Sequence, residues 1–480
     1  TWGTVDWSLN GQGNLILKPT SGTYGELASF APNATTVVNA SAPTLVPWYY
    51  YRQNIRHAWI EGGADGTNTI GMQLGAGNTG GFFNGMFRGC SNMVSCDLRG
   101  LDTSQGAGAR QMFDGCSSLT ELDTSRFDTH LMTDMFGMFQ DCTNLVTLPL
   151  GSFDVSKVTN MAYMFNNCQS LLGSQLANGT TGLDIGNYST DSLVDASYMF
   201  ANCASLRQID LKAFTTTNVL SMSHMFANCR SAGYINASTL TMNKVGSANV
   251  TWNVVTDANK ASDTVTTQTV IGSLQSMFQG CVNATQIDMP RTIDISSVTD
   301  MSYMFAGCEK LPGVDLSGLR ISADASKVTT MVGMFQDDKA LATVEWPERL
   351  TLTSLSTGAA EPDTGASYAK NGMDYMFAGC TSLTEMDMSP IVVTNNCSTN
   401  SMFRDCANLE LVDLYTWTTT AARNANFMFY NCQKLTTVFV GESFWAMNTT
   451  DYSKWSQRQL LSGNNVFTNC YSIKGYDGTT

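Results

Sequence analysis

The amino-acid sequence predicts an α/β repeat protein, a solenoid in which similar coils stack and each coil buries its apolar side against its neighbours. Three observations support this prediction. A Met-Phe-x-x-Cys motif recurs along the chain, and six of the intervals between neighbouring copies are 26 residues. A Leu-rich segment follows most copies at a constant distance. Charged residues make up only 14% of the 480 residues, which suits short turns better than long surface helices.

The motif occurs in thirteen copies, two of which are degenerate. Asp338 stands in the Cys position of one degenerate copy, and Val466 replaces Met in the other. The complete copies begin at Met86, Met112, Met138, Met164, Met199, Met225, Met277, Met304, Met376, Met402 and Met428. Because a repeat array grows in one direction, a chain of this length needs no single compact core.

Residues 1–81 precede the repeats, and we expect them to form an N-terminal β-rich capping module. Residues 2–9 and 14–17 are predicted to be two strands around a Gly-rich turn. An aromatic cluster that includes Trp48 follows at residues 47–60. It fits either a sugar-binding platform or a cap over the first coil, and we favour the cap because solenoids require one.

Each repeat combines two apolar periods. In the copy that includes Val158 to Cys168, apolar residues are spaced as on one face of a helix, whereas Leu119 to Asp123 alternate inward and outward as a short strand does. We therefore expect each coil to run strand, turn, short helix, turn. Successive strands would form one parallel β-sheet, with short helices or turns on the opposite face. The Leu-x-x-Leu-x-Leu frame makes this a leucine-rich-repeat-like solenoid, capped at both ends.

The solenoid is predicted to span residues 82–433, and residues 434–480 are expected to form the C-terminal repeat and cap. Insertions disturb the period near residues 172–183, 240–270 and 346–372. Insertions in solenoids emerge as loops, often on the face that binds a partner. For each insertion taken alone, neutral loop growth is an equal alternative.

Twelve of the 14 cysteines occupy the same position of the repeat. A column of this kind predicts a ladder of free, buried thiols. Helices at the motif would lie about 8–10 Å apart, beyond the reach of under about 7 Å that most disulfides have. Cys96 and Cys397 lie outside the ladder and are the candidates for a bridge or a reactive thiol.

Several segments resemble the repeats of BspA-like leucine-rich-repeat bacterial surface proteins. The resemblance rests on Ser-x-Val-Thr-x-Met-x-x-Met-Phe-x-x-Cys, as around residues 158–171, and on Val-Asp-Leu-Ser within 298–319. Residues 7–9 and 47–52 resemble the leader module of that family, and residues 470–478 resemble its terminal unit. The resemblance covers nearly the whole chain. It implies a secreted or wall-attached protein and, for some members, adhesion to host matrix proteins or other cells, and it supplies no shared catalytic residues.

An acidic column follows the second core residue of the strands, and its side chains should point out of the sheet. Stacked coils would place neighbouring carboxylates about 4.8 Å apart, a repulsive arrangement that hydrogen bonds, raised pKa values, calcium or a basic partner could relieve. We identify this column as the candidate ligand surface. The alternative is that nearby backbone N–H groups or hydroxyls satisfy each carboxylate. The column contains Asp97, Asp123, Asp210, Asp288, Asp315, Glu345, Asp387 and Asp413.

The formal net charge of −14 argues against nucleic acid or an anionic membrane as a partner. The sequence has no run of about 18 apolar residues that would span a membrane. With three His and no catalytic motif, we expect no enzyme activity and no cofactor, calcium excepted.

The predicted function is that of an adhesin, a cell-surface protein that binds an extracellular protein or glycan through its sheet face and inserted loops. The alternative is a structural spacer or a surface-layer component that associates with itself. We expect an extracellular location, with the anchor outside this chain.

Overall fold

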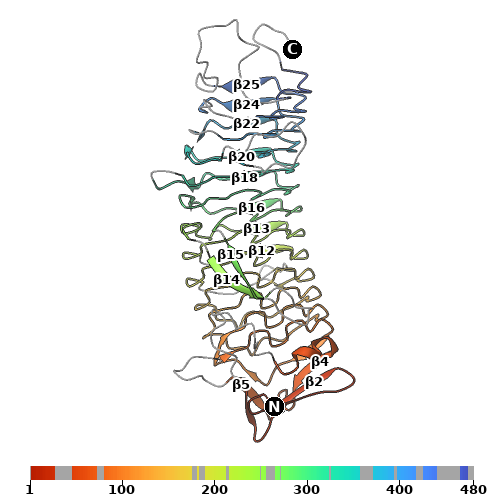
Figure 1. Ribbon diagram of the computed structural model, residues 1–480. Helices are drawn as coiled ribbons and strands as arrows, with labels where there is room; N and C mark the ends of the chain where they lie inside the picture. The colour runs from red at the N-terminus through yellow and green to blue at the C-terminus, as the bar shows by residue number, and fades with distance from the viewer. Residues whose placement is uncertain are drawn as a thin grey trace. The chain divides into compact units, whose positions relative to one another are not determined.

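The computed structural model describes residues 2–27, 46–72, 81–175, 181–182, 190–211, 214, 216–248, 250–255, 265–270, 272–323, 326–356, 371–393, 397–417, 425–440 and 465–473. They fall into two compact units. The first comprises Thr1–Ala232 with Ala248–Ile271, and the second comprises Gly233–Ser247 with Gly272–Thr480. Each unit is a stack of coils joined by short parallel strands (Figure 1), so the leucine-rich-repeat-like solenoid is confirmed.

The first unit begins with the expected hairpin, in which Val5–Leu9 (β1) and Asn14–Pro19 (β2) pair antiparallel. The side chain of Asn10 holds the turn, because its Oδ1 accepts the N–H groups of Gln12 and Asn14, each at 3.0 Å. Three columns of parallel strands then follow. They are β2 with β4 (His57–Ile60) and β7 (Ser95–Asp97); β3 (Tyr24–Leu27) with β5 (Thr69–Met72) and β8 (Leu101–Asp102); and β6 (Gly81–Phe82) with β9 (Gly106–Gly108).

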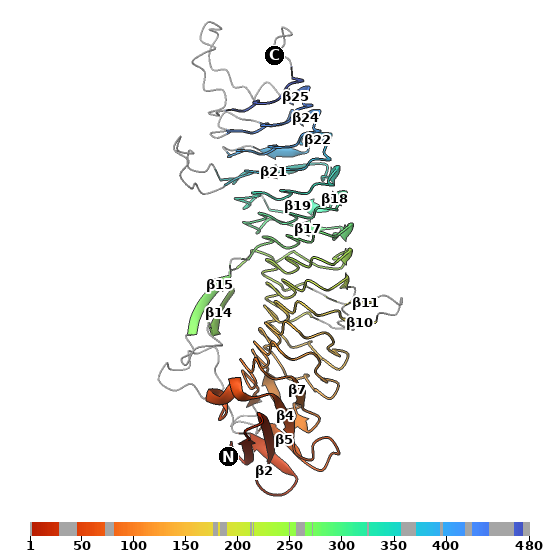
Figure 2. The same cartoon turned by 90° about the vertical axis from the view of Figure 1, so that its right-hand side faces the viewer.

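Farther along the first unit, single parallel bridges replace most strands, as between Glu121 and Thr147. The strand β12 covers Gln208–Asp210. Two of the insertions form antiparallel hairpins, β10 (Ser174–Gln175) with β11 (Thr181–Gly182) and β14 (Val250–Val255) with β15 (Val265–Val270). Figure 2 shows the second hairpin as a two-stranded ribbon.

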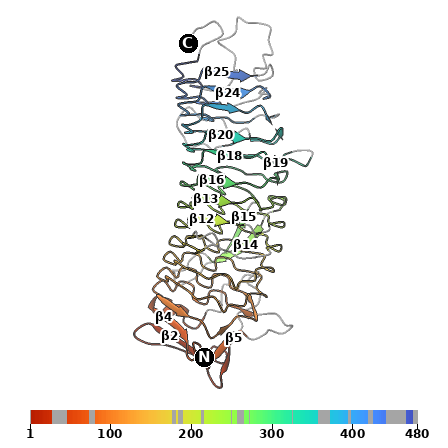
Figure 3. The ribbon, with the colours of Figure 1, turned by 180° about the vertical axis from the view of Figure 1, so that it is seen from behind.

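The second unit carries two columns of strands (Figure 3). The first column consists of β13 (Tyr234–Asn236), β16 (Gln286–Asp288), β18 (Gly313–Asp315), β20 (Thr343–Glu345), β22 (Glu385–Asp387), β24 (Leu411–Leu414) and β25 (Thr437–Val440). The second column was predicted as turns and consists of β17 (Ile293–Asp294), β19 (Leu319–Arg320), β21 (Leu350–Leu352) and β23 (Ile391–Val393). All the registered pairs of this unit run parallel.

The prediction of short helices at the motif is wrong. Among the described residues the only helical element is the 3-10 helix η1, Tyr49–Asn54, and the motif segments are successive turns. In one copy the N–H of Met164 bonds to the carbonyl of Met161, while the N–H of Phe165 bonds to Met199 of the next coil at 2.9 Å. Along the motif, the N–H groups therefore alternate between a hydrogen bond within the same coil and one to the next coil. The local bonds reach back three residues, and this spacing imitates a helical apolar period in the sequence.

Two residues in each copy have a positive φ, which a right-handed helix does not tolerate. One precedes Met, as does Tyr163 with φ 60°, and the other precedes Cys, as does Asn167 with φ 63°. The position before Cys is always Gly, Asn or Asp, the residues that adopt this conformation most readily. These residues are Gly89, Gly115, Asp141, Asn167, Asn202, Asn228, Gly280, Gly307, Asp337, Gly379, Asp405, Asn431 and Asn469.

The core of each unit contains a column of stacked Phe rings. In the first unit, neighbouring centroids from Phe87 to Phe226 are 5.4 to 5.8 Å apart. In the second unit, those from Phe278 to Phe467 are 5.3 to 5.4 Å apart. Trp48 is fully buried and stacks on Phe87 at 6.3 Å, so its ring is not displayed as a sugar platform. The domain boundaries at residues 81 and 433 remain predictions.

All 14 cysteines are free and buried, which confirms the thiol ladder. The expected coil spacing was too large, and another contact occupies the thiols: Cys116 donates to the carbonyl of Phe87 in the preceding coil at 3.2 Å. The same contact recurs at Cys142, Cys168, Cys203, Cys229, Cys308, Cys380, Cys406, Cys432 and Cys470. The suggestion that Cys96 or Cys397 is bridged is wrong, because both thiols are free and buried. Burial raises the pKa of the Cys397 thiol to about 12, which disfavours the reactive thiolate.

Candidate binding surface

The acidic column lies at the ends of the first-column strands or the equivalent bridges. Asp123, Asp315, Glu345 and Asp387 are exposed, and the other four members are partly exposed. Buried residues flank every Asp of the column on both sides, as Val314 and Leu316 flank Asp315, whereas the neighbours of Glu345 are partly exposed. This alternation comes from the pleat of the strand, which turns successive side chains to opposite faces.

Strand register brings some of these carboxylates side by side in the second unit. Asp315 is the registered partner of Glu345, and Asp387 is the registered partner of Asp413. Asp288 is paired instead with the neutral Asn236. Carboxylates of the column therefore lie side by side in two registered pairs. We call these four residues the paired acidic surface: Asp315, Glu345, Asp387 and Asp413.

One carboxylate oxygen of each Asp on this surface holds the turn that follows its strand. Oδ1 of Asp387 accepts the N–H of Ser389 at 2.8 Å, and Oδ1 of Asp413 accepts that of Tyr415 at 2.8 Å. Oδ1 of Asp315 accepts both the N–H and the hydroxyl of its second neighbour, at 2.9 and 2.6 Å. A short acidic side chain favours this turn, so the column has a structural role.

The second carboxylate oxygen divides the acidic column into bonded and available members. Oδ2 of Asp315, Asp387 and Asp413 accepts no hydrogen bond from the described residues. In the first unit, Arg99 binds both oxygens of Asp97, with Nη2 to Oδ2 at 2.6 Å. The Arg99 side chain lowers the pKa of the Asp97 carboxyl. Available acidic oxygens therefore lie at Asp123 and, side by side, on the paired acidic surface.

The hypothesis of raised pKa values is wrong for Asp97 and Asp123. Hydrogen bonds from Ser125 lower the pKa of Asp123, as Arg99 lowers that of Asp97. Relief of the repulsion comes from donors in these turns. The alternative interpretation of satisfied carboxylates is therefore correct for Asp97 and Asp288, while the three Asp carboxylates of the paired acidic surface are satisfied on one oxygen only.

Two aromatic residues that were not assigned to a site lie beside the paired acidic surface. Tyr415 follows Asp413 in the same turn and is 67% exposed. Phe439 is the registered partner of Asp413 on β25 and is 50% exposed. Two sequence signals could have found them. Tyr415 stands two residues after the acidic residue, where other coils have Ser, and Phe439 stands within the acidic column itself.

Metal-ligating side chains do not gather within the described part of the chain: no group of three or more His, Cys, Asp or Glu could hold an ion. Calcium takes about six to eight oxygen ligands. An acidic pair such as Asp387 with Asp413 would therefore need further oxygens from a bound partner to hold calcium.

The three His residues do not form one constellation. His130 hydrogen-bonds through Nδ1 to Oδ1 of Asp128 at 2.6 Å in an exposed turn. His224 stacks on Tyr198 at 4.3 Å, and desolvation lowers the pKa of its ring to about 4. His57 lies on β4 and contacts the hydroxyl of Ser95 at 2.8 Å. The expectation that the chain is not an enzyme remains untested.

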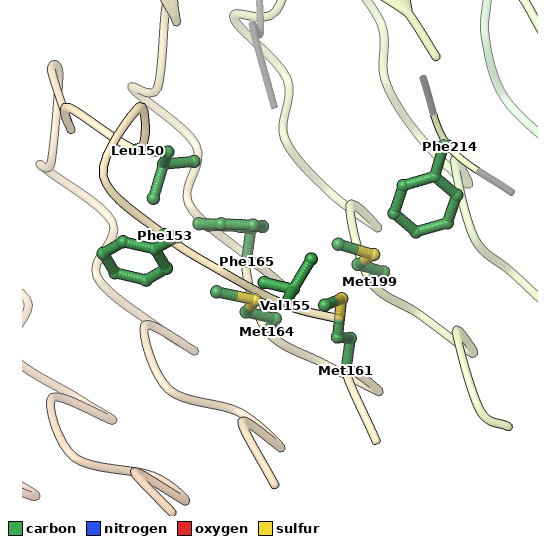
Figure 4. Close-up of a pocket in the computed structure, with 8 residues that line it drawn as sticks. All are labelled: Leu150, Phe153, Val155, Met161, Met164, Phe165, Met199 and Phe214. Atoms are coloured by element: carbon green, nitrogen blue, oxygen red, sulfur yellow. The ribbon is translucent and has the colours of Figure 1, made fainter. Parts of the chain in front are cut away.

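A small apolar void lies inside the first unit. It measures about 10 Å³ and lies among Met161, Met164, Phe165, Met199 and Phe214 (Figure 4). A polar site of at least about 10–15 Å³ is needed to hold one water molecule, and apolar cavities stay dry. This void is a packing defect of the core and offers no ligand site.

The fold places the chain in the class of leucine-rich-repeat-like solenoid proteins, with an acidic and partly aromatic face along its strands. The chain belongs to the family described as "Mycoplasma protein of unknown function, DUF285", whose model matches residues 82–181, 176–265, 272–344 and 368–475. No curated protein matches the chain. The described residues contain no helix with the length and apolarity needed to cross a membrane.

The chain is similar to several solved structures, among them three from bacteria. A leucine rich cell surface protein from Faecalibacterium prausnitzii is 17% identical, with 95% of this chain and 96% of that chain covered and a TM-score of 0.38. A leucine-rich repeat protein from Eubacterium ventriosum is 14% identical, with 98% and 94% covered and a TM-score of 0.32. One from Bacteroides ovatus is 14% identical, with 91% and 92% covered and a TM-score of 0.32.

Proposed function

We propose that this protein is a cell-surface adhesin that binds a basic segment of an extracellular protein through the paired acidic surface. The observation that carries the proposal is the registered pair of Asp387 and Asp413, in which Oδ1 of each carboxylate is held by its turn. The turns fix the two carboxylates in place before a partner arrives. A preorganised acceptor loses little conformational entropy on binding.

The chemistry of the surface favours a cationic partner. Carboxylate oxygens accept bidentate hydrogen bonds from Arg, and aromatic rings attract the same guanidinium group. Tyr415 and Phe439 place such rings next to Asp413. Exposed Tyr and buried charge pairs are frequent centres of binding energy at protein interfaces. The resemblance to BspA-like surface proteins supports display outside the cell.

Binding of the whole chain to extracellular-matrix proteins and mucins, with and without calcium, tests this proposal. We expect saturable capture of at least one protein with a basic segment, weakening as salt rises because exposed charges are screened. Tyr415→Ser should reduce the affinity and leave the turn to Asp413 intact. Capture that ignores both salt and Tyr415→Ser would contradict the proposed surface. Failure to bind any partner, together with concentration-dependent assembly of the chain, would favour a self-associating structural protein.

A further inference from the structure

A polar pocket of about 330 Å³ opens on the second unit, in the turns that follow β13 and β16. Its volume lies at the lower end of the range of about 300–1,000 Å³ for small-molecule sites. The polar lining combines four hydroxyls, one amide and one guanidinium group, from Ser238, Thr239, Thr241, Thr292, Asn243 and Arg291. Nothing in the acidic column accounts for this pocket.

One wall of the pocket is a turn with an extra residue. The interval from Met277 to Met304 is 27 residues, one more than the usual repeat of this chain. Ile293 is in register with Leu319, yet the turn from Asp288 to Ile293 is one residue longer than that from Asp315 to Leu319. The added length lies around Arg291, which carries its side chain to the surface.

The backbone of this longer turn is fixed by close packing on the next coil. A Cβ atom at Gly318 would lie 2.7 Å from the carbonyl carbon and oxygen of Arg291, so only glycine fits there. On the opposite wall, Oδ1 of Asn236 accepts both the N–H and the hydroxyl of Ser238, at 3.2 and 2.6 Å. Both walls of the pocket are therefore held in place by specific contacts.

The charges around the pocket leave Arg291 available to an anion. The neutral Asn236 takes the place of an acidic residue in this coil. The nearby carboxyl of Asp288 already accepts hydrogen bonds from the hydroxyl of Tyr234 at 2.6 Å and from Gln286 at 2.8 Å. Arg291 is exposed and forms no ion pair with any described residue. A guanidinium group in this setting suits a carboxylate, which it binds through two parallel hydrogen bonds.

We propose that this pocket binds an acidic monosaccharide unit. The sugar carboxylate would pair with Arg291, and the ring hydroxyls would exchange hydrogen bonds with Ser238, Thr241, Thr292 and Asn243. A simple oxyanion needs fewer partners than this lining offers, and hydroxyls and amides can both donate and accept. The pocket lies apart from the paired acidic surface. It would bind a negatively charged sugar, whereas the paired acidic surface would bind a positively charged protein segment.

Calorimetric titration of the whole chain with galacturonate, galactose and inorganic sulfate tests the proposal. We expect saturable galacturonate binding, with galactose at least about tenfold weaker because the charged hydrogen bond is lost. Arg291→Gln should weaken galacturonate binding by about tenfold or more, and Arg291→Lys should weaken it less. Arg320→Gln removes an exposed Arg that lies outside the pocket and should leave the affinity within about twofold.

Four results would overturn the assignment. Galactose could bind as tightly as galacturonate, or no sugar could bind saturably. Arg291→Gln and Arg320→Gln could have the same effect, which would point to general surface charge. Sulfate that binds as tightly as galacturonate would show that the pocket recognises an anion without the sugar ring.

Discussion

The backbone N–H of Cys308 donates a hydrogen bond of 2.7 Å to Oδ1 of Asp338 in the next coil. Asp338 occupies the Cys position of its repeat and is fully buried. In complete copies the thiol donates to a Phe carbonyl, as Cys380 does to Phe335 at 3.1 Å. Oδ2 of Asp338 has no hydrogen-bond partner among the described residues. The thiol ladder is thus interrupted by a buried acid.

Restoring the ladder should stabilise the second unit. We expect Asp338→Cys to raise its free energy of unfolding by about 1–3 kcal/mol, because an unsatisfied buried polar group is removed. The midpoint of denaturant unfolding measures this change. Asp337→Asn, which removes a neighbouring charge at a positive-φ position that Asn tolerates, should change stability by less than about 0.5 kcal/mol. Destabilisation by Asp338→Cys would contradict the proposed equivalence of the two positions.

The same residue predicts a pH dependence. Burial raises the pKa of Asp338 well above its usual value, so the folded chain keeps a proton that the unfolded chain releases above about pH 4. Stability should therefore fall as pH rises from about 4.5 toward neutrality. The difference between the parent protein and Asp338→Cys, measured by unfolding across this range, isolates the contribution. A difference that is independent of pH would show that the carboxyl is not protonated in the fold.

The positive-φ position before Cys predicts an order of substitutions. At Gly307, φ is 75° and a Cβ would meet only Gly280 at 3.7 Å, so conformation rather than crowding decides the outcome. We expect Gly307→Ala to destabilise by about 1–2 kcal/mol and Gly307→Asn by less. Thermal unfolding of both variants checks the order. Gly151→Ala, at an open position without positive φ, should be nearly neutral.

The thiol ladder predicts slow cysteine chemistry. Burial raises the pKa of the Cys90 and Cys406 thiols to about 12, and all 14 cysteines are buried. Titration of the native chain with a disulfide reagent should label few thiols quickly, and denaturation should expose all of them. Cys470, whose pKa is raised only to about 11, should react first. Rapid labelling of Cys96 or Cys397 would revive the hypothesis of a reactive thiol.

Much of the solenoid could be predicted from the repeat, because a fixed period and an inward Leu alternation leave few other folds. The helix assignment failed because the motif segment forms local bonds across three residues, and Met161, Met164 and Phe165 therefore look helical. The residue before Cys held the missing signal. A position confined to Gly, Asn and Asp, such as Asn167, indicates positive φ and excludes a helix.

The acidic column was correctly placed on the strands, but the sequence alone could not divide it. Whether Asp97 or Asp387 has an available oxygen depends on neighbours such as Arg99. The Arg291 pocket was also missed. A single extra residue resembled ordinary variation of the period, and its consequence depends on how the longer turn packs against Gly318.

The central claim is that each Asp of the paired acidic surface uses one oxygen for the fold and the other for a partner. The double variant Asp387→Asn/Asp413→Asn keeps an Oδ1 acceptor for each turn and removes both charges. Both quantities are measured on the variant and the parent under the same conditions. We predict that the Tm of the variant lies within about 2 °C of the parent and that its affinity for the captured basic protein is reduced by at least about tenfold. The control variant Asp123→Asn, which lies in an equivalent turn, should change neither the Tm nor the affinity. Unchanged affinity, or a fall in Tm that accounts for the lost binding, would contradict the account.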